Sequence, residues 1–113
     1  MSSGDGRVHY GVARVEIHLP GVDSLKGKRA LLNRAKAALT KELGVSVAEV
    51  GEQDRWQRTV FGVAVAASTH TGVDRVLDRV TAVLERDPRI VVLGSHDVAD
   101  TLDGDGPGLP HLS

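Results

Sequence analysis

The chain has 113 residues, of which 41% are hydrophobic and 26% charged, with a formal net charge of −1 and no cysteine. This length predicts one domain, and the composition is that of an ordinary globular protein. The lack of cysteine excludes a disulfide framework and a thiolate metal site, and a net charge near zero gives no global attraction to nucleic acid. Any nucleic-acid binding must therefore depend on a local patch.

The two ends of the chain differ in composition from the segment between them. Residues 1–6 are small and polar, and residues 99–113 are acidic and rich in glycine and proline. We therefore expect a flexible N-terminal tail over 1–6, a folded domain over 7–98 and a C-terminal tail over 99–113. The sequence shows no signal peptide and no apolar run of membrane-spanning length, so we expect a cytoplasmic protein without a membrane partner.

The first elements expected are a strand and a long helix. Apolar residues at alternate positions predict a strand over residues 7–19. Ser24 is a good N-cap for a helix from Leu25 to Leu43, and Gly44 stands where a helix favours a left-handed residue. The helix is lopsided in charge, because only Glu42 is acidic. Its cations are Lys26, Lys28, Arg29, Arg34, Lys36 and Lys41.

Two β-prone runs flank a polar tip in the middle of the chain. The runs cover residues 45–50 and 59–67, and the tip at 51–58 carries the single tryptophan, Trp56. This pattern predicts a long β-hairpin with a roomy turn, around which the other elements pack.

The last elements expected are a second helix and a short strand. Apolar residues at helical spacing between 73 and 84 predict one amphipathic helix. Thr71, with an acid three residues later, fits a capping pattern at its start. Asp87 ends it, because the residue before a proline is displaced from the helical region. A strand over residues 90–93 follows.

The order strand, helix, strand, strand, helix, strand predicts an α+β fold. We expect a ferredoxin-like two-layer sandwich, βαββαβ, with antiparallel sheet order 4-1-3-2 and both helices on one face. The start of the first helix, the hairpin tip and the connection before Pro88 then lie at one end of the sheet. We expect the following residues to share that neighbourhood: Lys26, Lys28, Arg55, Trp56, Arg58, Arg86 and Arg89.

Two segments of the chain carry a family resemblance, GVARVEIHLPGVDSLKGKR and VSVAEVGEQDRWQRTVFGVAV. With the phrases HLPG…SLK.KR, SVAEVG and QD.WQR, the chain resembles the YlxP-like family of small bacterial proteins (domain of unknown function 503) from about Val8 to Leu93. The resemblance implies a ferredoxin-like fold and a cytoplasmic bacterial protein, and family members are often encoded beside translation-initiation and ribosome-maturation genes. It brings no catalytic residues. The chain departs from the family at Gly27, where a charged residue is usual, and in its longer acidic tail.

No motif in the sequence indicates nucleotide, metal or catalytic chemistry. Gly27 and Lys28 lack the earlier glycine and the following Ser or Thr of a P-loop. The five histidines have no paired ligand spacing, so we expect no metal and no cofactor. Ser24 is explained as a cap, and no catalytic residue is assigned. An enzyme with a site between subunits, using His18 and Glu16, is the weakest of three hypotheses.

The leading hypothesis is a non-enzymatic binding protein that acts on the ribosome or ribosomal RNA. Phe61 shares a strand face with core valines, so the sheet lacks the stacking platform of an RNA-recognition motif. Binding would depend on phosphate contacts, with Trp56 as a stacking or packing group. The competing explanation is a solvated basic face and a ring folded back over the hairpin. The residues assigned to nucleic-acid binding are Lys26, Lys28, Arg29, Arg55, Trp56 and Arg58.

The alternative hypothesis is a homo-oligomeric structural or regulatory module that binds a protein or small metabolite. The third strand is apolar on both faces, whereas a two-layer sandwich covers only one face of its sheet. The competing explanation is a central strand with tolerated alanines. The residues assigned to the oligomer surface, beside Tyr10 and Val12, are Val60, Gly62, Ala64 and Ala66.

Overall fold

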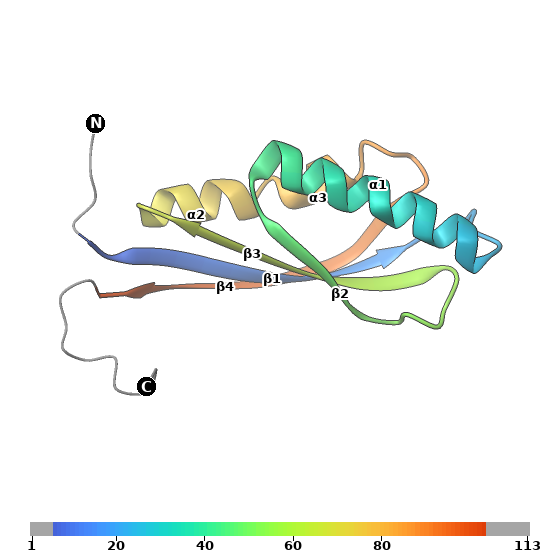
Figure 1. Ribbon diagram of the computed structural model, residues 1–113, viewed down its shortest axis with the longest axis horizontal. Helices are drawn as coiled ribbons and strands as arrows, with labels where there is room; N and C mark the ends of the chain where they lie inside the picture. Colours follow the sequence, from blue (N-terminus) through green and yellow to red (C-terminus); the bar gives the residue numbers. More distant parts are fainter. Residues whose placement is uncertain (1–5, 104–113) are drawn as a thin grey trace.

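Within residues 6–103, the part of the chain that the computed structural model describes, three helices lie on one face of a four-stranded antiparallel sheet (Figure 1). The strands are β1 (Val8–His18), β2 (Ser46–Gly51), β3 (Arg58–Ala67) and β4 (Val91–Leu102). The helices are α1 (Leu25–Leu43), α2 (His70–Leu77) and α3 (Val80–Leu84). The fold is α+β, as predicted.

The sheet has the strand order β2-β3-β1-β4, which places β1 between two antiparallel neighbours. Counted from the β4 edge, this is the order 4-1-3-2. The side chains of β1 alternate in exposure, and Ala13, Val15 and Ile17 are buried beneath the helices. Phe61 of β3 is fully buried, so its predicted place in the core is confirmed. The other face of the sheet carries no helix, and we call it the open face (Figure 1).

Helix α1 begins and ends where local signals predicted. The Oγ of Ser24 accepts a hydrogen bond from the backbone N–H of Gly27 at 3.0 Å. Gly44 follows the last turn with φ 66°, a left-handed conformation that glycine adopts without a steric penalty. In Figure 1 the start of α1 lies at the same end of the molecule as the hairpin tip.

The single second helix predicted is wrong, because α2 and α3 are separated at Asp78 and Arg79. The Arg79 N–H donates to the carbonyl of Val76 at 3.1 Å, a tighter i−3 bond that interrupts the helix. The predicted cap is also wrong: the Oγ1 of Thr69, not of Thr71, accepts from the Gly72 N–H at 3.0 Å. The apolar spacing predicted burial correctly, since residues on both sides of the break face the core.

Strand β4 is longer than predicted and pairs with β1 from His18 to Val8. Its second half alternates polar and apolar residues, and its last four residues fall in the predicted acidic tail. An edge strand with one open face tolerates such residues, and charges there discourage pairing with other chains. Residues 99–102 therefore belong to the sheet, and the predicted domain boundary at 98 falls inside β4. Residues 1–5 and 104–113 of the predicted tails lie outside the described residues.

Helix α2 packs closely over the start of β1. A Cβ at Gly11 would lie 2.7 Å from Val73 Cγ1 and 2.8 Å from Leu77 Cδ1, so a larger residue would have to displace these side chains. This end of the sheet is held by apolar packing. In residues 6–103 no helix combines the length and the apolar character needed to cross a membrane.

Candidate nucleic-acid interface

The hairpin tip, residues 51–58, has an irregular backbone that needs support. Glu52 has φ 59°, a left-handed conformation that costs a residue with a side chain about 1–2 kcal/mol. The Arg55 N–H donates to the carbonyl of Glu52 at 3.1 Å and closes a turn. The carbonyl oxygens of this turn point to one side and need donors.

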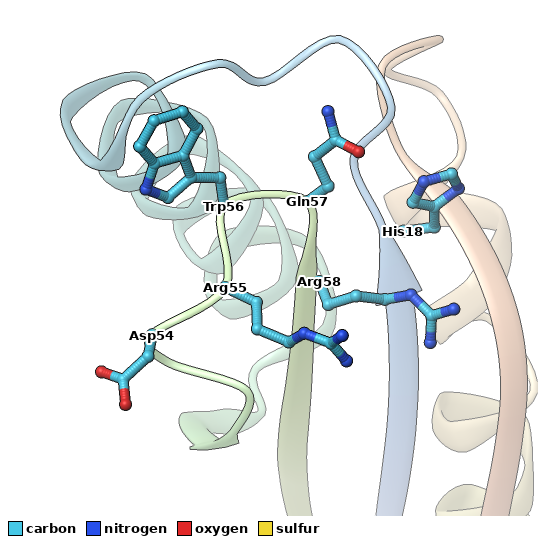
Figure 2. A pocket seen from close by; sticks show the side chains of 6 residues that line it. All are labelled: His18, Asp54, Arg55, Trp56, Gln57 and Arg58. Carbon is cyan, nitrogen blue, oxygen red and sulfur yellow. The ribbon is translucent and has the colours of Figure 1, made fainter.

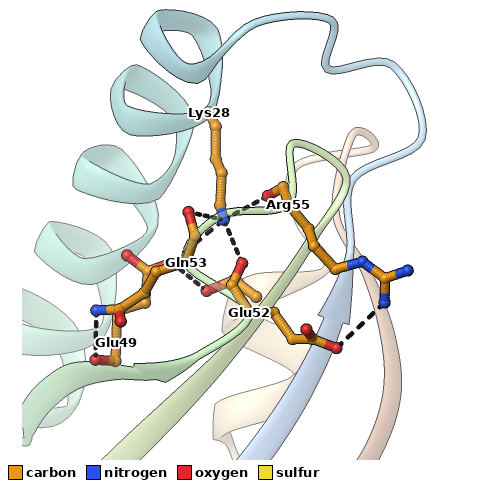
Figure 3. A network of polar contacts seen from close by, with 6 residues as sticks. Lys28, Glu49, Glu52, Gln53 and Arg55 are labelled. Carbon is orange, nitrogen blue, oxygen red and sulfur yellow. Dashed lines mark hydrogen bonds and ion pairs between the residues drawn. The ribbon is translucent and has the colours of Figure 1, made fainter.

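Lys28 of α1 supplies these donors (Figure 3). Its side chain is only 3% exposed, and we call the arrangement around it the Lys28 clasp. The ammonium donates to three loop carbonyl oxygens: Glu52 at 2.8 Å, Gln53 at 3.3 Å and Arg55 at 2.6 Å. It also lies 3.4 Å from a carboxylate oxygen of Glu49, which accepts a hydrogen bond from the Thr59 hydroxyl at 2.7 Å.

The clasp uses the whole donor capacity of the ammonium. Removing an ammonium from water costs several kcal/mol, and three hydrogen bonds of about 1.5–3 kcal/mol each offset that cost. Lys28 therefore has no donor left for a phosphate group. Its assignment to nucleic-acid binding is corrected: Lys28 fixes the loop that carries other candidate residues.

Gln57 fastens the tip to the loop that precedes α1. Its side-chain amide donates to the carbonyl oxygens of Pro20 at 3.3 Å and Val22 at 3.2 Å. The Leu19 N–H donates to the Gln57 carbonyl at 2.9 Å. Lys28 and Gln57, both within the phrases that carry the family resemblance, thus have structural roles.

A shallow cavity of about 550 Å³ lies beside the tip, lined by residues of the tip and of β1 (Figure 2). Arg58 of β3 lies directly opposite His18 of β1 in the strand register, on the open face. Trp56 is 51% exposed and points away from the guanidinium groups of Arg55 and Arg58 (Figure 2). The ring is therefore available on one side of the loop and the two cations on the other. The lining residues are His18, Asp54, Arg55, Trp56, Gln57 and Arg58.

Two guanidinium groups and one carboxylate line this cavity. Arg55 lies 3.4 Å from a carboxylate oxygen of Glu52, but both side chains are exposed, 64% and 40%. Exposed ion pairs are worth about 0–1 kcal/mol, so a phosphate group can compete for this arginine. Asp54 brings one opposing charge.

The remaining cations of α1 differ in position. A second cavity of about 340 Å³ lies between α1 and the tip, and Arg29 and Lys36 line it beside Asp54. Lys26 is exposed and lines neither cavity. Five of the six residues assigned from sequence thus lie at one end of the molecule with side chains that a ligand can reach. Lys28 lies at the same end, but its side chain is buried.

The expectation that Arg86 shares this neighbourhood is wrong. Its guanidinium contacts a carboxylate oxygen of Glu42 at 2.6 Å. Glu42 lies about 24 Å along α1 from Lys26, at 1.5 Å per residue. Arg89 is held by Asp87 instead, through two hydrogen bonds of 2.9 and 2.7 Å. These bonds and the Arg89 backbone N–H lower the pKa of Asp87 to about 2.

The residues assigned to an oligomer surface also differ in position. Val60 is buried, so a partner does not reach it, whereas Gly62 is partly exposed, with Val50 Cγ1 3.2 Å from the place of a Cβ. Ala64 and Ala66 are exposed on the open face. Sequence reasoning missed Val98 because it ended the last strand at residue 93.

The two residues of the enzyme hypothesis do not form a dyad. Glu16 pairs with Arg14 at 3.3 Å. In residues 6–103 no hydrogen bond joins His18 to Glu16, and no group of three His, Asp or Glu side chains is placed to hold a metal ion.

Residues 10–97 match the model of a protein family of unknown function, DUF503. The chain belongs to this family. A relative from Bacillus subtilis (strain 168), the uncharacterized protein YlxP, is 39% identical over 80 residues, which are 71% of this chain and 87% of that protein. The family resemblance found in the sequence is therefore confirmed.

Two further similarities to this DUF503 chain are of different kinds. A glycogen synthase from Anaeromyxobacter dehalogenans (strain 2CP-1 / ATCC BAA-258) is 36% identical over 85 residues, which are 73% of this chain but only 16% of that protein. A solved structure of SnoaB, a cofactor-independent oxygenase from Streptomyces nogalater, has a TM-score of 0.41 and 16% identity, covering 91% of this chain and 99% of that chain. That structural similarity is too low to support an argument about function.

Proposed function

We propose that this DUF503 protein is a cytoplasmic, non-enzymatic RNA-binding protein that acts on the ribosome or ribosomal RNA through its hairpin tip. One observation carries the proposal: a half-exposed Trp56 and the arginines Arg55 and Arg58 project from a loop whose backbone is fixed by Lys28. A fixed loop loses little conformational entropy on binding.

The proposed contacts follow from the chemistry of these side chains. Guanidinium groups bind phosphate oxygens through paired N–H donors, so Arg55 and Arg58 hold the RNA backbone. An unpaired base stacks on Trp56, which is worth about 1–3 kcal/mol per base. Lys26 and Arg29 extend the positive surface toward α1.

The first experiment uses Trp56 as its own probe, because it is the single tryptophan of the chain. Fragments of ribosomal RNA are titrated into the protein while tryptophan fluorescence is recorded. We expect quenching by single-stranded regions and weaker binding as salt rises, with a slope of about −0.7 per phosphate contact. Binding that is insensitive to salt would contradict the proposal.

Variants assign the contacts, with RNA binding measured on filters. Trp56→Ala should weaken binding about 5- to 150-fold, the equivalent of one lost stacking interaction. Arg55→Gln and Arg58→Gln should each reduce the salt slope by about 0.7. The matched control is Lys41→Gln, which removes an exposed charge from the far end of α1 and should change nothing. Equal effects of the control and the tip variants would refute an interface at the tip.

The exposed apolar residues of the open face favour a second candidate function, a homo-oligomeric structural or regulatory module that binds a protein or small metabolite. Its first requirement is self-association. Sedimentation of the purified protein tests that requirement without any assumption about a ligand.

We also infer that the fold is a ferredoxin-like sandwich. The strand order and the placement of all three helices on one face support this inference. The break between α2 and α3 is then a local irregularity in the second crossover of the βαββαβ pattern.

A further inference from the structure

The open face exposes an apolar patch at the end of the sheet opposite the hairpin tip. Tyr10, Val12 and Val98 are 42%, 46% and 58% exposed. Within residues 6–103 no element covers them. We call the following residues the open-face patch: Val8, Tyr10, Val12, Ala64, Ala66 and Val98.

The strand register arranges the open face in three rows that cross β3, β1 and β4. From the far end toward the tip, the rows are Ala66–Tyr10–Asp100, Ala64–Val12–Val98 and Gly62–Arg14–His96. The first row carries a carboxylate, the middle row is apolar, and the third row carries a guanidinium and an imidazole. Charge therefore changes sign across the apolar row.

We propose that a second copy of this chain packs on the open-face patch, face to face, about a two-fold axis that passes over the middle row at right angles to the strands. Each strand then lies antiparallel over its own copy. The first row of each molecule faces the third row of the other, so Asp100 meets His96 of the second copy. Tyr10 meets Arg14 of the second copy, a favourable cation–π geometry.

The charges select this axis over the other simple one. A two-fold axis parallel to the strands would place every row over itself, so the Arg14 row would face another Arg14 row. Face-to-face sheets pack within about 30° of alignment, which keeps each charged row within side-chain reach of its complement. An isologous interface needs a self-complementary surface, and the sequence of rows has this property.

The pairing state of the charged residues supports the same arrangement. Arg14 already has a partner in Glu16 at 3.3 Å, but within residues 6–103 neither Asp100 nor His96 forms an ion pair. The proposed dimer gives both a partner. The dimer places the two hairpin tips at opposite ends, away from the open-face patch. The inference therefore does not depend on RNA binding by the tip.

Sedimentation velocity of the full chain tests the interface. We expect a concentration-dependent dimer, and Val12→Glu should weaken it at least tenfold because two like-charged carboxylates, one from each copy, then face each other at the axis. Leu25→Glu is the matched control, since Leu25 is 40% exposed on α1 and outside the patch. Far-UV circular dichroism verifies that each variant is folded. A protein that stays monomeric at every accessible concentration overturns the proposal. This holds even if residues 104–113 are then found to occupy the patch.

A charge exchange tests the axis itself. Asp100→Lys and His96→Glu should each weaken the homodimer, whereas an equal mixture of the two variants should form heterodimers and the double variant should form homodimers again. Positions 96 and 100 are about 13 Å apart along β4, at about 3.3 Å per residue, so restoration cannot arise within one chain. If the mixture and the double variant stay dissociated, the proposed axis is wrong.

Discussion

The two ends of the sheet are held by different kinds of interaction. At the tip end, Lys28 fixes a strained loop through hydrogen bonds to backbone carbonyls. At the other end, α2 fixes β1 by close apolar packing over Gly11. Apolar packing buries the side chains that it orders, so they cannot contact a ligand. Hydrogen bonds to the backbone order a loop and leave its side chains exposed. The tip is therefore suited to present Arg55 and Trp56 to a ligand.

The largest expected effect comes from a variant that removes the hydrogen bonds at the tip end of the sheet. Lys28→Met keeps the length of the side chain but removes the ammonium that three carbonyls and the Glu49 carboxylate share, so we expect a loss of about 3–5 kcal/mol in the free energy of unfolding. Urea unfolding followed by circular dichroism measures it. Hydrogen exchange at the Arg55 amide should also accelerate, because this amide closes the supported turn.

The control for that variant is Lys26→Met, on the same helix turn but exposed. It should change stability by less than about 0.5 kcal/mol. If both variants lose the same amount, the clasp contributes nothing specific.

An intermediate effect is expected from a variant that disturbs the apolar packing at the other end of the sheet. Gly11→Ala places a Cβ against Val73 and Leu77, and overpacking of this kind costs about 1–3 kcal/mol. Gly94→Ala is the control, because nothing lies within 4 Å of a Cβ at Gly94. The same urea experiment applies. Equal stability of the two variants would show that α2 moves away from β1 at little cost.

The smallest effect shows what directional hydrogen bonds do at an exposed site. The pKa of Asp87 is about 2, below the ordinary 3.8, because Arg89 donates to its carboxylate. A depressed folded-state pKa stabilises the protein above about pH 4, and this contribution is lost as the pH falls through about 2. Titration by NMR should show the low midpoint, and Arg89→Ala should return it toward 3.8. An unchanged midpoint would assign the shift to another cause.

Features with local causes could be predicted from the sequence. Both ends of α1 follow from Ser24 and Gly44, whose effects involve only neighbouring residues. The break between α2 and α3 could not be predicted, because the apolar spacing of a continuous helix and of two short helices is the same here. The full length of β4 depends on β1, a strand far away in the sequence that supplies its hydrogen-bond partners.

The role of Lys28 had a signal in the sequence that charge alone concealed. It lies three residues after Leu25 and four before Leu32, and so on the apolar stripe of α1. A cation on a buried stripe needs acceptors, but the acceptors belong to a loop at residues 52–55. The charge of the helix therefore predicted that Lys28 contacts phosphate, whereas in the fold Lys28 donates hydrogen bonds to loop carbonyls.

The register of β1 with β4 sets where the chain enters and leaves the fold. Val8 lies directly opposite Leu102, and paired residues in antiparallel strands have Cα atoms about 5 Å apart. A short linker can therefore join these two positions, and a circularly permuted chain opened elsewhere should keep the same sheet. A fluorophore or affinity tag attached at either position is likewise carried away from residues 51–58, so immobilisation through it leaves the tip accessible.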